Sequence, residues 1–401
     1  MKSLDFKNKK VLVRVDFNVP IGKNYEVTDD TRIRGALPTL NYILGQGGSL
    51  ILMSHLSRPL KKLNEDGTIN VQKFTLRHII PSLSELLGVN VDFAADCIGQ
   101  EAVEKSGKLQ PGQVLLLENT RFYKEEESGN EDFAKKLASL ADMFVNDAFG
   151  TAHRAHASTT IVAKYFSKDQ KALGLLMGQE VENAEKLMHD TPHPFTAIIG
   201  GAKVSDKIQL LDTLIQKADN ILIGGGMAFT FIRALGGKIG NSLLEADYLT
   251  LALELLEKAK ARGVQIYLPK DSVISDKFSE DGEIKTVDSY QIPDEWLGLD
   301  IGPVAIEDYR EVIKQSKGIL WNGPLGVFEM EKFAKGTFEI AAAIAAATQN
   351  GAFSLIGGGD SVSAINKSGL DDQVSYISTG GGAMLEFFEG KVLPGIAAMK
   401  E

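Results

Sequence analysis

The chain has 401 residues, 44% of them hydrophobic and 24% charged, which is ordinary for a globular protein and predicts two or three domains. This composition excludes collagen-like, disordered and disulfide-scaffold proteins. The net charge of −10 disfavours a general nucleic-acid or anionic-membrane surface. Cys97 is the only cysteine, the N-terminus does not resemble a signal peptide, and no run reaches the roughly 18 apolar residues of a membrane span. We therefore expect a cytoplasmic protein without a nucleic-acid or membrane partner.

Short apolar runs of β-branched and aliphatic residues alternate with helix-length segments along the whole chain. We predict strands within residues 9–15, 49–55, 113–119, 143–149, 196–201, 220–226, 264–269, 318–323, 353–359 and 374–382. We predict helices within residues 130–141, 203–217, 247–262, 333–349 and 360–368. Strands that are apolar throughout and separated by helices form parallel sheets with both faces covered. The predicted fold class is therefore α/β, with doubly wound, Rossmann-like parallel sheets.

The two halves of the chain differ in the polar residues that punctuate them. Seven of the ten arginines lie in the first 154 residues, and all six histidines lie in the first 193. In the second half, the apolar runs end in pairs or triplets of glycine. Residues 173–188 have helical apolar spacing, and the prolines of residues 189–194 end that helix. We predict an N-terminal domain of residues 1–172, a joining helix over 173–188, and a C-terminal domain of residues 189–387.

Glycine turns between a strand and a helix recur in the second half, at residues 200–201, 224–226, 357–359 and 380–382. Ligands of an open parallel sheet bind outside the carboxyl ends of its strands, where glycine lets the backbone approach closely and the next helix offers free N–H groups. A tight turn alone explains one such pattern, but four in one domain favour a phosphate ligand. The sequence lacks both G-x-G-x-x-G and G-x-x-x-x-G-K-[ST], which disfavours a dinucleotide-dependent oxidoreductase and a P-loop enzyme.

Charged residues near these turns are candidates for phosphate chemistry. Lys203 and Lys207 are four residues apart and are predicted to share one face of the first helical turns, where they would stabilise a phosphoryl group in transfer; two solvated lysines are the alternative. Asp360 is predicted to be the first residue or N-cap of a helix and to hold Mg2+, unless it serves only as a cap. Ser361 would add a hydroxyl. Glu329 is placed to bond a ribose, or is an ordinary surface glutamate.

The polar residues of the first half follow the ends of the apolar runs, and they are Arg14, Asp16, Asn18, His55, Arg58, Arg121, His153, Arg154 and His156. Arg32 lies at the start of the first predicted helix. Because the carboxyl ends of parallel strands lie along one edge, these groups converge on a site for a small, multiply anionic molecule. No third ligand stands near His153 and His156, which disfavours zinc. A nucleotide site and an anion site in separate domains predict phosphoryl transfer across a hinge-closing cleft.

Long motifs in the sequence resemble the signatures of the phosphoglycerate kinase family. Those of the first half are RVDFNVP (14–20), SHLSRP (54–59), LLENTRF (116–122) and NDAFGTAHRAH (146–156). Those of the second half are GGAKVSDKI (200–208), GGGMAFTF (224–231), GLDIGP (298–303), WNGPLGVFE (321–329), GGGDS (357–361) and STGGGAMLEFFEGKVLPG (378–395). They occur in the family's order over nearly the whole chain.

This resemblance implies reversible, Mg2+-dependent phosphoryl transfer between 1,3-bisphosphoglycerate and ADP, giving 3-phosphoglycerate and ATP. It implies that the phosphoglycerate is bound by Asp16, Asn18, Arg32, His55, Arg58, Arg121 and Arg154. It implies that the catalytic residues are Arg32, Lys203 and Lys207. The nucleotide site that it implies comprises Gly200, Gly201, Lys203, Lys207, Gly224, Gly225, Asn322, Pro324, Glu329, Gly358, Gly359, Asp360 and Ser361, with Mg2+ held by Asp360 through the nucleotide phosphates. It also implies a monomer whose segment 388–401 packs back on the N-terminal domain.

The sequence departs from the family's common pattern at three serines. Ser57 stands where glycine is frequent, Ser205 where alanine is common, and Ser361 where threonine is common. None of these departures removes a charged group, although Ser57 makes the geometry of the substrate loop less certain. Two alternatives remain, namely a catalytically inactive relative that still binds nucleotide and a nicotinamide-dependent dehydrogenase, which the missing dinucleotide motif disfavours.

Overall fold

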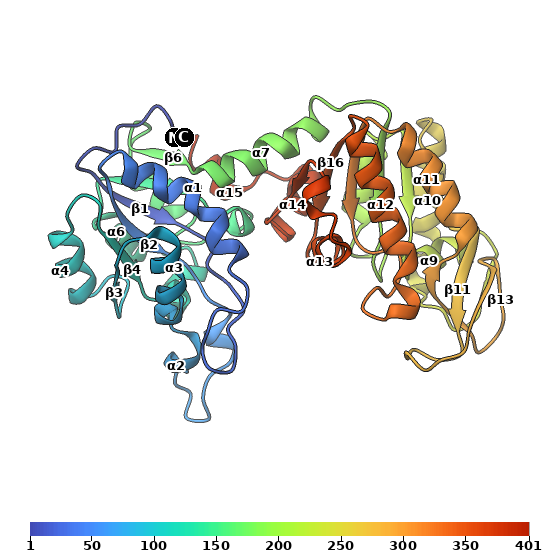
Figure 1. The fold of residues 1–401 in the computed structure, drawn as a ribbon, viewed down its shortest axis with the longest axis horizontal. Coiled ribbons are helices and arrows are strands. Elements are labelled where there is room, and N and C mark those ends of the chain that lie inside the picture. The colour runs from blue at the N-terminus through green and yellow to red at the C-terminus, as the bar shows by residue number, and fades with distance from the viewer. Residues whose placement is uncertain (401) are drawn as a thin grey trace. The chain divides into compact units, whose positions relative to one another are not determined.

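Residues 1–400, which the computed structural model describes, divide into two units (Figure 1). The first unit is Met1–Val181 together with the end of the chain from Val392, and the second is Glu182–Lys391. The boundary falls inside α7 (Leu175–Met188), a helix that lies where the apolar spacing predicted one. None of the helices formed by residues 1–400 is long and apolar enough to cross a bilayer. Glu401, the last residue of the segment predicted to pack on the N-terminal domain, lies outside the described residues.

The described part of the first unit contains a six-stranded parallel sheet with the order β3-β4-β2-β1-β5-β6. The chain places β2, β3 and β4 on one side of β1 and then returns to add β5 and β6 on the other, as in a doubly wound sheet. The strands are β1 (Lys10–Arg14), β2 (Ser49–Met53), β3 (Val91–Ala94), β4 (Val114–Leu117), β5 (Met143–Asn146) and β6 (Lys171–Leu173). The helices are α1 (Thr31–Gly45), α2 (Val71–Phe74), α3 (Ile80–Leu87), α4 (Gln100–Lys108), α5 (Lys124–Glu127), α6 (Glu131–Ala138) and α15 (Pro394–Ala397).

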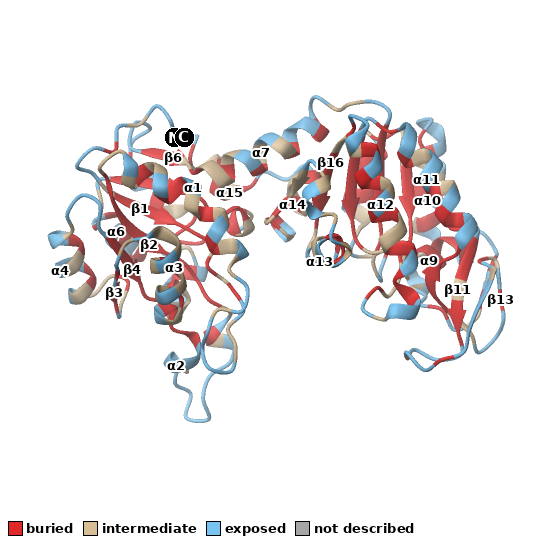
Figure 2. Ribbon diagram, viewed as in Figure 1, coloured by how far each residue is buried: buried red, intermediate tan, exposed pale blue. Residues whose placement is uncertain are grey.

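Helices cover both faces of this first sheet, which explains why most residues of its strands are apolar. Alternate residues of a strand point to opposite faces. Val13 of β1 packs in one core cluster with Leu40 of α1, whereas its neighbour Leu12 packs in another with Leu137 of α6. Both strand residues are fully buried, and Figure 2 shows the same burial along the neighbouring strands.

The second unit, within its described residues, contains another six-stranded parallel sheet, in the order β10-β8-β7-β15-β16-β17. Its strands are β7 (Phe195–Ile199), β8 (Asn220–Ile223), β10 (Gln265–Tyr267), β15 (Gly318–Asn322), β16 (Phe353–Gly357) and β17 (Tyr376–Ile377). The helices are α8 (Ile208–Leu214), α9 (Met227–Ala234), α10 (Leu249–Ala261), α11 (Pro303–Gln315), α12 (Lys335–Gln349), α13 (Gly359–Ser368) and α14 (Gly382–Phe388). Each of the ten apolar runs singled out in the sequence overlaps a strand of one of these two sheets. The prediction of a doubly wound α/β fold is therefore confirmed.

The C-terminal residues join the first unit by backbone contacts. The N–H of Gly395 in α15 donates to the carbonyl of Ala152 at 2.8 Å. Its carbonyl accepts a hydrogen bond from the Asn146 side chain at the end of β5. Met399 belongs to the core cluster that covers one face of the first sheet. The last turn of the chain thus helps to close this core.

Several strands were not recognised in the sequence. β3 and β6 lie at the edges of the first sheet, where short runs with polar residues give a weak signal. The second unit also carries an antiparallel sheet, in which β11 (Asp271–Ser275) lies between β12 (Ile284–Asp288) and β14 (Leu297–Ile301). β13 (Gln291–Ile292) pairs with β9 (Lys238–Ile239) beside it. Most residues of β12 are exposed, so this strand has no apolar run to reveal it.

A buried carboxylate anchors the start of α7. The Oδ1 atom of Asp147, directly after β5, accepts the N–H of Met177 at 3.1 Å. A Cβ atom at Gly174 would lie 2.0 Å from the same Oδ1, so the close approach requires glycine. Burial raises the pKa of Asp147 to about 7, against the lowering effect of its hydrogen bonds. The protonated carboxyl is therefore the favoured form in the folded protein below that pH.

The variant Asp147→Asn tests this raised pKa. The free carboxyl titrates near 4 when the chain is unfolded, so the folded protein loses stability from this group as pH rises from about 4 to about 7. The asparagine variant lacks that loss. We expect the difference in free energy of unfolding, variant minus wild type, to increase by roughly 1–3 kcal/mol as pH rises from 5 to 8. Urea denaturation at each pH measures it. The exposed Asp132→Asn variant is the control, and an equal pH dependence in all three proteins would contradict the assignment.

Candidate functional site

The residues predicted to bind a small anion lie along the carboxyl edge of the first sheet. The loops after β1, β2, β4 and β5 carry all but one of them, since Arg32 belongs to the first turn of α1. In strand order these four strands are neighbours, so their loops meet. The residues on the loops are Asp16, Asn18, His55, Arg58, Arg121 and Arg154.

Hydrogen bonds hold the loop after β2 in place. The Asn18 side chain accepts the N–H of Ser57 at 2.8 Å, and Nη1 of Arg121 donates to the Ser57 carbonyl, also at 2.8 Å. Ser57 has a φ of 58°, a left-handed conformation that favours glycine. This conformation explains why glycine suits the position, and the two flanking bonds keep the serine in it.

Arg32 and Asp16 form an ion pair with an N–O distance of 2.8 Å. The Asp16 side chain is 12% exposed and that of Arg32 is 39% exposed, so the guanidinium reaches solvent while the carboxylate orients it. Asp16 also accepts the N–H of Asn18 at 3.2 Å. The acid thus serves as a support for a basic group and for the loop after β1.

Arg58 and Arg154 are exposed. The Arg154 carbonyl accepts hydrogen bonds from the hydroxyls of Thr159 and Thr160 at 2.9 and 3.0 Å. The charge of Arg58 helps to lower the pKa of Arg121, although burial is the larger cause. The exposed arginines therefore belong to the same electrostatic field as the buried ones.

Two histidines in this cluster are held neutral. Burial, followed by the charges of Arg14, Arg121 and Arg32, lowers the pKa of His55 well below its ordinary value. Burial and the neighbouring guanidiniums lower the pKa of His156 to about 4. At pH 7 both imidazoles are uncharged, so the positive charge of the site comes from arginine. Such a site suits a ligand with several negative charges.

Sequence reasoning placed Arg14 at the end of a strand, among the polar residues that converge on the anion site, but did not count it among the substrate-binding residues. The structure buries it completely, with its guanidinium 3.3 Å from Nδ1 of His55. A charged residue inside an apolar strand, KVLVR, is the one local signal that marks it. Ser158, its buried partner, and Glu126 of α5, which Ser158 bonds in turn, carry no such signal, because they lie far from Arg14 in the sequence.

In the second unit, glycine turns lie at the carboxyl edge of the other parallel sheet. Gly200 and Gly201 follow β7, and their N–H groups donate to the carbonyls of Asn322, the last residue of β15, and of Pro324 in the loop after it. A Cβ atom at Gly200 would lie 2.0 Å from the Pro324 carbonyl oxygen. Gly225 follows β8 with a φ of 70°, and a Cβ atom there would lie 2.5 Å from the Gly201 carbonyl. The absence of side chains thus lets three loops meet; Gly224 packs against Leu325 in the same cluster.

The prediction that Lys203 and Lys207 lie on one face of a helix is wrong. α8 begins at Ile208, and Lys207 is the residue before it. Ser205 explains the difference, because its N–H and its hydroxyl both bond the Glu245 carboxylate, at 3.0 and 2.6 Å. This long-range contact holds residues 202–207 in a loop. The two lysines are therefore placed by the loop and not by helical spacing.

The two lysines differ in their surroundings. Lys203 is exposed, whereas Lys207 is partly buried and donates from Nζ to Oδ1 of Asn322 at the end of β15. Burial lowers the pKa of Lys207, and the charges of Asp206 and Asp360 oppose that effect. Lys207 is thus a cation with a fixed position near the glycine-rich edge.

The start of α13 brings the last predicted group together. The N-cap is Gly358 and the helix begins at Gly359, so Asp360 is the second helical residue. The prediction that Asp360 is the first helical residue or the N-cap is therefore wrong. The Asp360 side chain is exposed. Ser361 is fully buried, and its Oγ accepts the N–H of Gly323 at 2.6 Å. Ser361 therefore ties two loops together.

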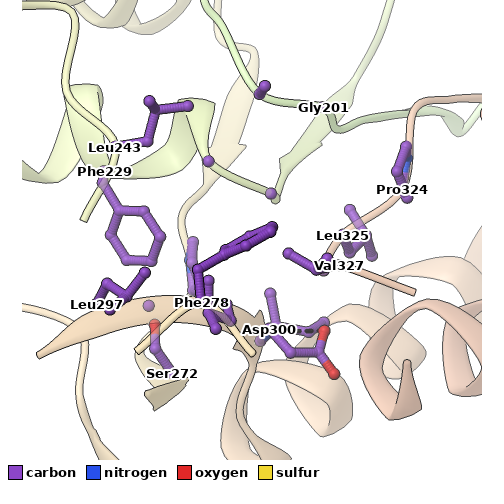
Figure 3. A pocket seen from close by; sticks show the side chains of 18 of the residues that line it. Gly201, Phe229, Leu243, Ser272, Phe278, Leu297, Asp300, Pro324, Leu325 and Val327 are labelled. Carbon is purple, nitrogen blue, oxygen red and sulfur yellow. Dashed lines mark hydrogen bonds between the residues drawn. The ribbon is translucent and has the colours of Figure 1, made fainter. Parts of the chain in front are cut away.

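A pocket of 410 Å³ opens beside this edge (Figure 3). Its predicted members include Gly201, Pro324, Glu329 and Asp360. The rest of the lining is largely apolar, with Phe229, Leu243, Leu297, Leu325 and Val327 around the ring of Phe278. A pocket with an apolar slot at one side and glycine turns and charged groups at the other suits a planar base joined to phosphates.

Sequence reasoning missed the apolar half of this pocket. Phe278 and Leu297 come from the antiparallel sheet and its loops, which were not predicted. Among residues 1–400, no three His, Cys, Asp or Glu side chains gather into a metal cluster. A cation here would depend on Asp360 together with oxygen atoms of a ligand.

Known proteins resemble this chain over its full length. A profile of the phosphoglycerate kinase family matches residues 1–391. The phosphoglycerate kinase of Porphyromonas gingivalis is 51% identical, with 100% of this chain and 99% of that protein covered. The cytosolic phosphoglycerate kinase of Nicotiana tabacum is also 51% identical, with coverage of 100% and 98%. The structure of the Coxiella burnetii phosphoglycerate kinase matches with a TM-score of 0.88 at 40% identity, covering 100% of this chain and 98% of that one.

The chain therefore belongs to the phosphoglycerate kinase family, as its motifs indicated. This membership confirms the prediction of a phosphotransferase with a carboxyl group as acceptor. It does not favour an inactive relative or a nicotinamide-dependent dehydrogenase.

Binding of an anion is expected to raise the pKa of His156 above about 4, its value in the protein without ligand. The anion offsets the charges of Arg14, Arg121 and Arg154, which help to keep the imidazole neutral. The measurement is an NMR titration of the imidazole signals with and without inorganic phosphate. His193, which is exposed in the second unit and paired with Asp219, is the internal control. An unchanged pKa of His156 at saturating phosphate would show that the arginine cluster does not bind anions.

Proposed function

We propose that the chain catalyses the reversible transfer of a phosphoryl group between 1,3-bisphosphoglycerate and ADP, giving 3-phosphoglycerate and ATP, a step of glycolysis. One observation carries the proposal. The carboxyl edge of one sheet gathers arginines around neutral histidines, and that of the other combines glycine turns, Lys207 and a base-sized pocket. The family membership of the whole chain supports the same reaction.

The arginine cluster of the first unit is proposed to bind the phosphoglycerate. The substrate carries a phosphate and a carboxylate, and guanidinium groups bind both with paired hydrogen bonds. The proposed substrate residues are Asp16, Asn18, Arg32, His55, Arg58, Arg121 and Arg154. The Asp16 carboxylate orients the Arg32 guanidinium through their ion pair. Asp16 thus contributes to substrate binding without contacting the anion itself.

The pocket of the second unit is proposed to bind the nucleotide. Its apolar slot is proposed to take the base, and Glu329, an exposed residue of the lining, is proposed to bond a ribose hydroxyl. The phosphates extend toward the glycine turns, Lys203, Lys207 and the start of α13. The proposed nucleotide residues are Gly200, Gly201, Lys203, Lys207, Gly224, Gly225, Asn322, Pro324, Glu329, Gly358, Gly359, Asp360 and Ser361.

Mg2+ is the proposed cofactor, and the donor set suits it. Asp360 is an exposed carboxylate at the edge of the nucleotide pocket. Mg2+ in proteins commonly takes one or two carboxylates and completes its shell with phosphate oxygens and water. When bound, the ion would neutralise charge on the nucleotide phosphates. Asp360 is the residue that would hold it; the Ser361 hydroxyl is fully buried and accepts the N–H of Gly323.

The chemistry requires positioning and charge neutralisation. The attacking oxygen is a carboxylate in one direction and an ADP phosphate in the other, and both are already ionised, so no general base is needed. When the carboxylate of 3-phosphoglycerate forms its bond to the γ-phosphorus, the bond from that phosphorus to the ADP oxygen breaks. Arg32, Lys203 and Lys207 are proposed to stabilise the phosphoryl group between them. The two ligands must meet and water must be excluded, so we propose closure of two domains about the helix that joins them.

We also propose a monomer that works in the cytoplasm with small-molecule partners alone. A relative that is 51% identical is named as cytosolic. The one thiol, Cys97, is buried. Sedimentation of the purified protein tests the monomer.

A coupled assay tests the proposed reaction. ATP consumption should depend on both 3-phosphoglycerate and Mg2+. The protein should not oxidise NADH when NADH is offered without ATP. No turnover, with ATP still bound, would reject the proposed reaction and leave a nucleotide-binding protein.

Lys207→Ala is expected to lower kcat by about 100-fold or more, with a much smaller effect on the KM for ATP. The ammonium group held by Asn322 stabilises charge most strongly in the transition state, so its loss appears in kcat. Steady-state kinetics in ATP measures both constants. The exposed Lys260→Ala variant is the control and should match wild type. A raised KM for ATP with a normal kcat would contradict the catalytic role of Lys207.

Arg154→Ala is expected to raise the KM for 3-phosphoglycerate about tenfold while the KM for ATP stays within about twofold. The exposed guanidinium meets the anion in the ground state as well as in the transition state, so binding suffers first. The matched control is Arg34→Ala, an exposed arginine of the same unit that is paired with Asp30. An unaltered KM for 3-phosphoglycerate would remove Arg154 from the substrate site.

A further inference from the structure

A chain of buried polar groups lies behind the arginine cluster. Glu126 of α5 and Ser158 are fully buried, as is Arg14, and His55 is 4% exposed. The Ser158 hydroxyl lies 2.5 Å from Oε1 of Glu126 and 2.7 Å from Nε of Arg14. Nη2 of Arg14 lies 3.3 Å from Nδ1 of His55. The chain Glu126–Ser158–Arg14–His55 therefore joins four separate segments of the first unit.

The direction of each hydrogen bond follows from the groups themselves. A guanidinium has no acceptor atom, so Arg14 donates to Ser158. A hydroxyl has one proton, so Ser158 donates it to the Glu126 carboxylate, whose other oxygen accepts the Ser158 N–H at 2.9 Å. The carboxylate thereby fixes the rotation of the hydroxyl, and the hydroxyl fixes the tilt of the guanidinium.

The last bond of the chain determines the proton position on His55. Because Arg14 can only donate, Nδ1 of His55 must accept, and the proton of the neutral ring lies on Nε2. Nη1 of Arg14 also donates to the carbonyl of Val15, which prevents the guanidinium from turning away. Nε2–H is thus the donor that His55 offers to a ligand.

We propose that Glu126 and Ser158 are positioning residues for the substrate site, acting through Arg14 to hold His55 with its proton on Nε2. This inference rests on the proposed function, because it is the phosphoglycerate anion that receives the Nε2–H bond. The loop that carries Ser158 also carries Arg154, so the same contacts fix both an exposed and a buried part of the site.

The tautomer of His55 in the wild-type protein is the first test. The 15N signals of the imidazole, assigned with a His55→Gln variant, distinguish a protonated Nε2 from a protonated Nδ1. A protonated Nε2 is expected. A protonated Nδ1 would overturn the proposal without any variant of the chain being needed, and the measurement does not require turnover.

Two variants then test the positioning role. Glu126→Gln preserves shape and Ser158→Ala removes the hydroxyl. Each is expected to raise the KM for 3-phosphoglycerate about tenfold and to leave the KM for ATP within about twofold, while the Nδ1-protonated form of His55 gains population. The matched controls are Glu125→Gln and Ser128→Ala, exposed neighbours of the same segment that should match wild type.

A merely structural role would lower the unfolding midpoint without moving the His55 tautomer or the ratio of the two KM values, and that result would overturn the proposal. If Ser158→Ala does not fold, the isosteric Glu126→Gln supplies the comparison. If the wild-type protein shows no turnover, the proposed function fails, but inorganic phosphate still tests the site: weaker phosphate binding in Glu126→Gln supports the positioning role, and equal binding rejects it.

Discussion

The parallel pairing of buried strands is the constraint on which both candidate sites depend. Helices on the two faces of the first sheet favour apolar side chains along most of its strands. Arg14, the last residue of β1, is charged and yet fully buried. Most polar groups of the site therefore lie in the loops, and parallel pairing brings the loops of neighbouring strands to one edge. The second sheet obeys the same rule with glycine in place of arginine.

Gathering cations at one edge has an electrostatic cost that shapes the rest of the first site. Like charges disfavour one another, and burial disfavours each of them further. The histidines respond by losing their protons, as the pKa of about 4 at His156 records. The arginines keep theirs, so they require carboxylates nearby, and Asp16 and Glu126 supply them. The cluster is therefore an arrangement in which arginine carries the charge and neutral histidine offers directed hydrogen bonds.

The parts that were predictable from the sequence are those set by local pattern. Apolar runs located the six strands of the second parallel sheet and four of the six strands of the first, and residues placed just after them were found at the two edges. Local pattern failed where a distant contact decides the backbone. Helical spacing predicted a helix through Lys203, but Glu245 bonds Ser205 and keeps that segment in a loop. The exposed strand β12 escaped notice because only its pairing with β11 makes it a strand.

The same distinction separates a site's membership from its geometry. The end of the KVLVR run placed Arg14 near the ligand edge, yet nothing adjacent to it indicates that the side chain turns inward. That direction is set by Ser158, which is 144 residues away from Arg14 in the chain. Ser158 is held in turn by Glu126, which is 32 residues away from it. An arginine free to reach solvent would compete with the exposed arginines for the ligand. Held inward, it directs His55 instead, so a residue that resembles a binding group in the sequence acts on the ligand through its neighbour.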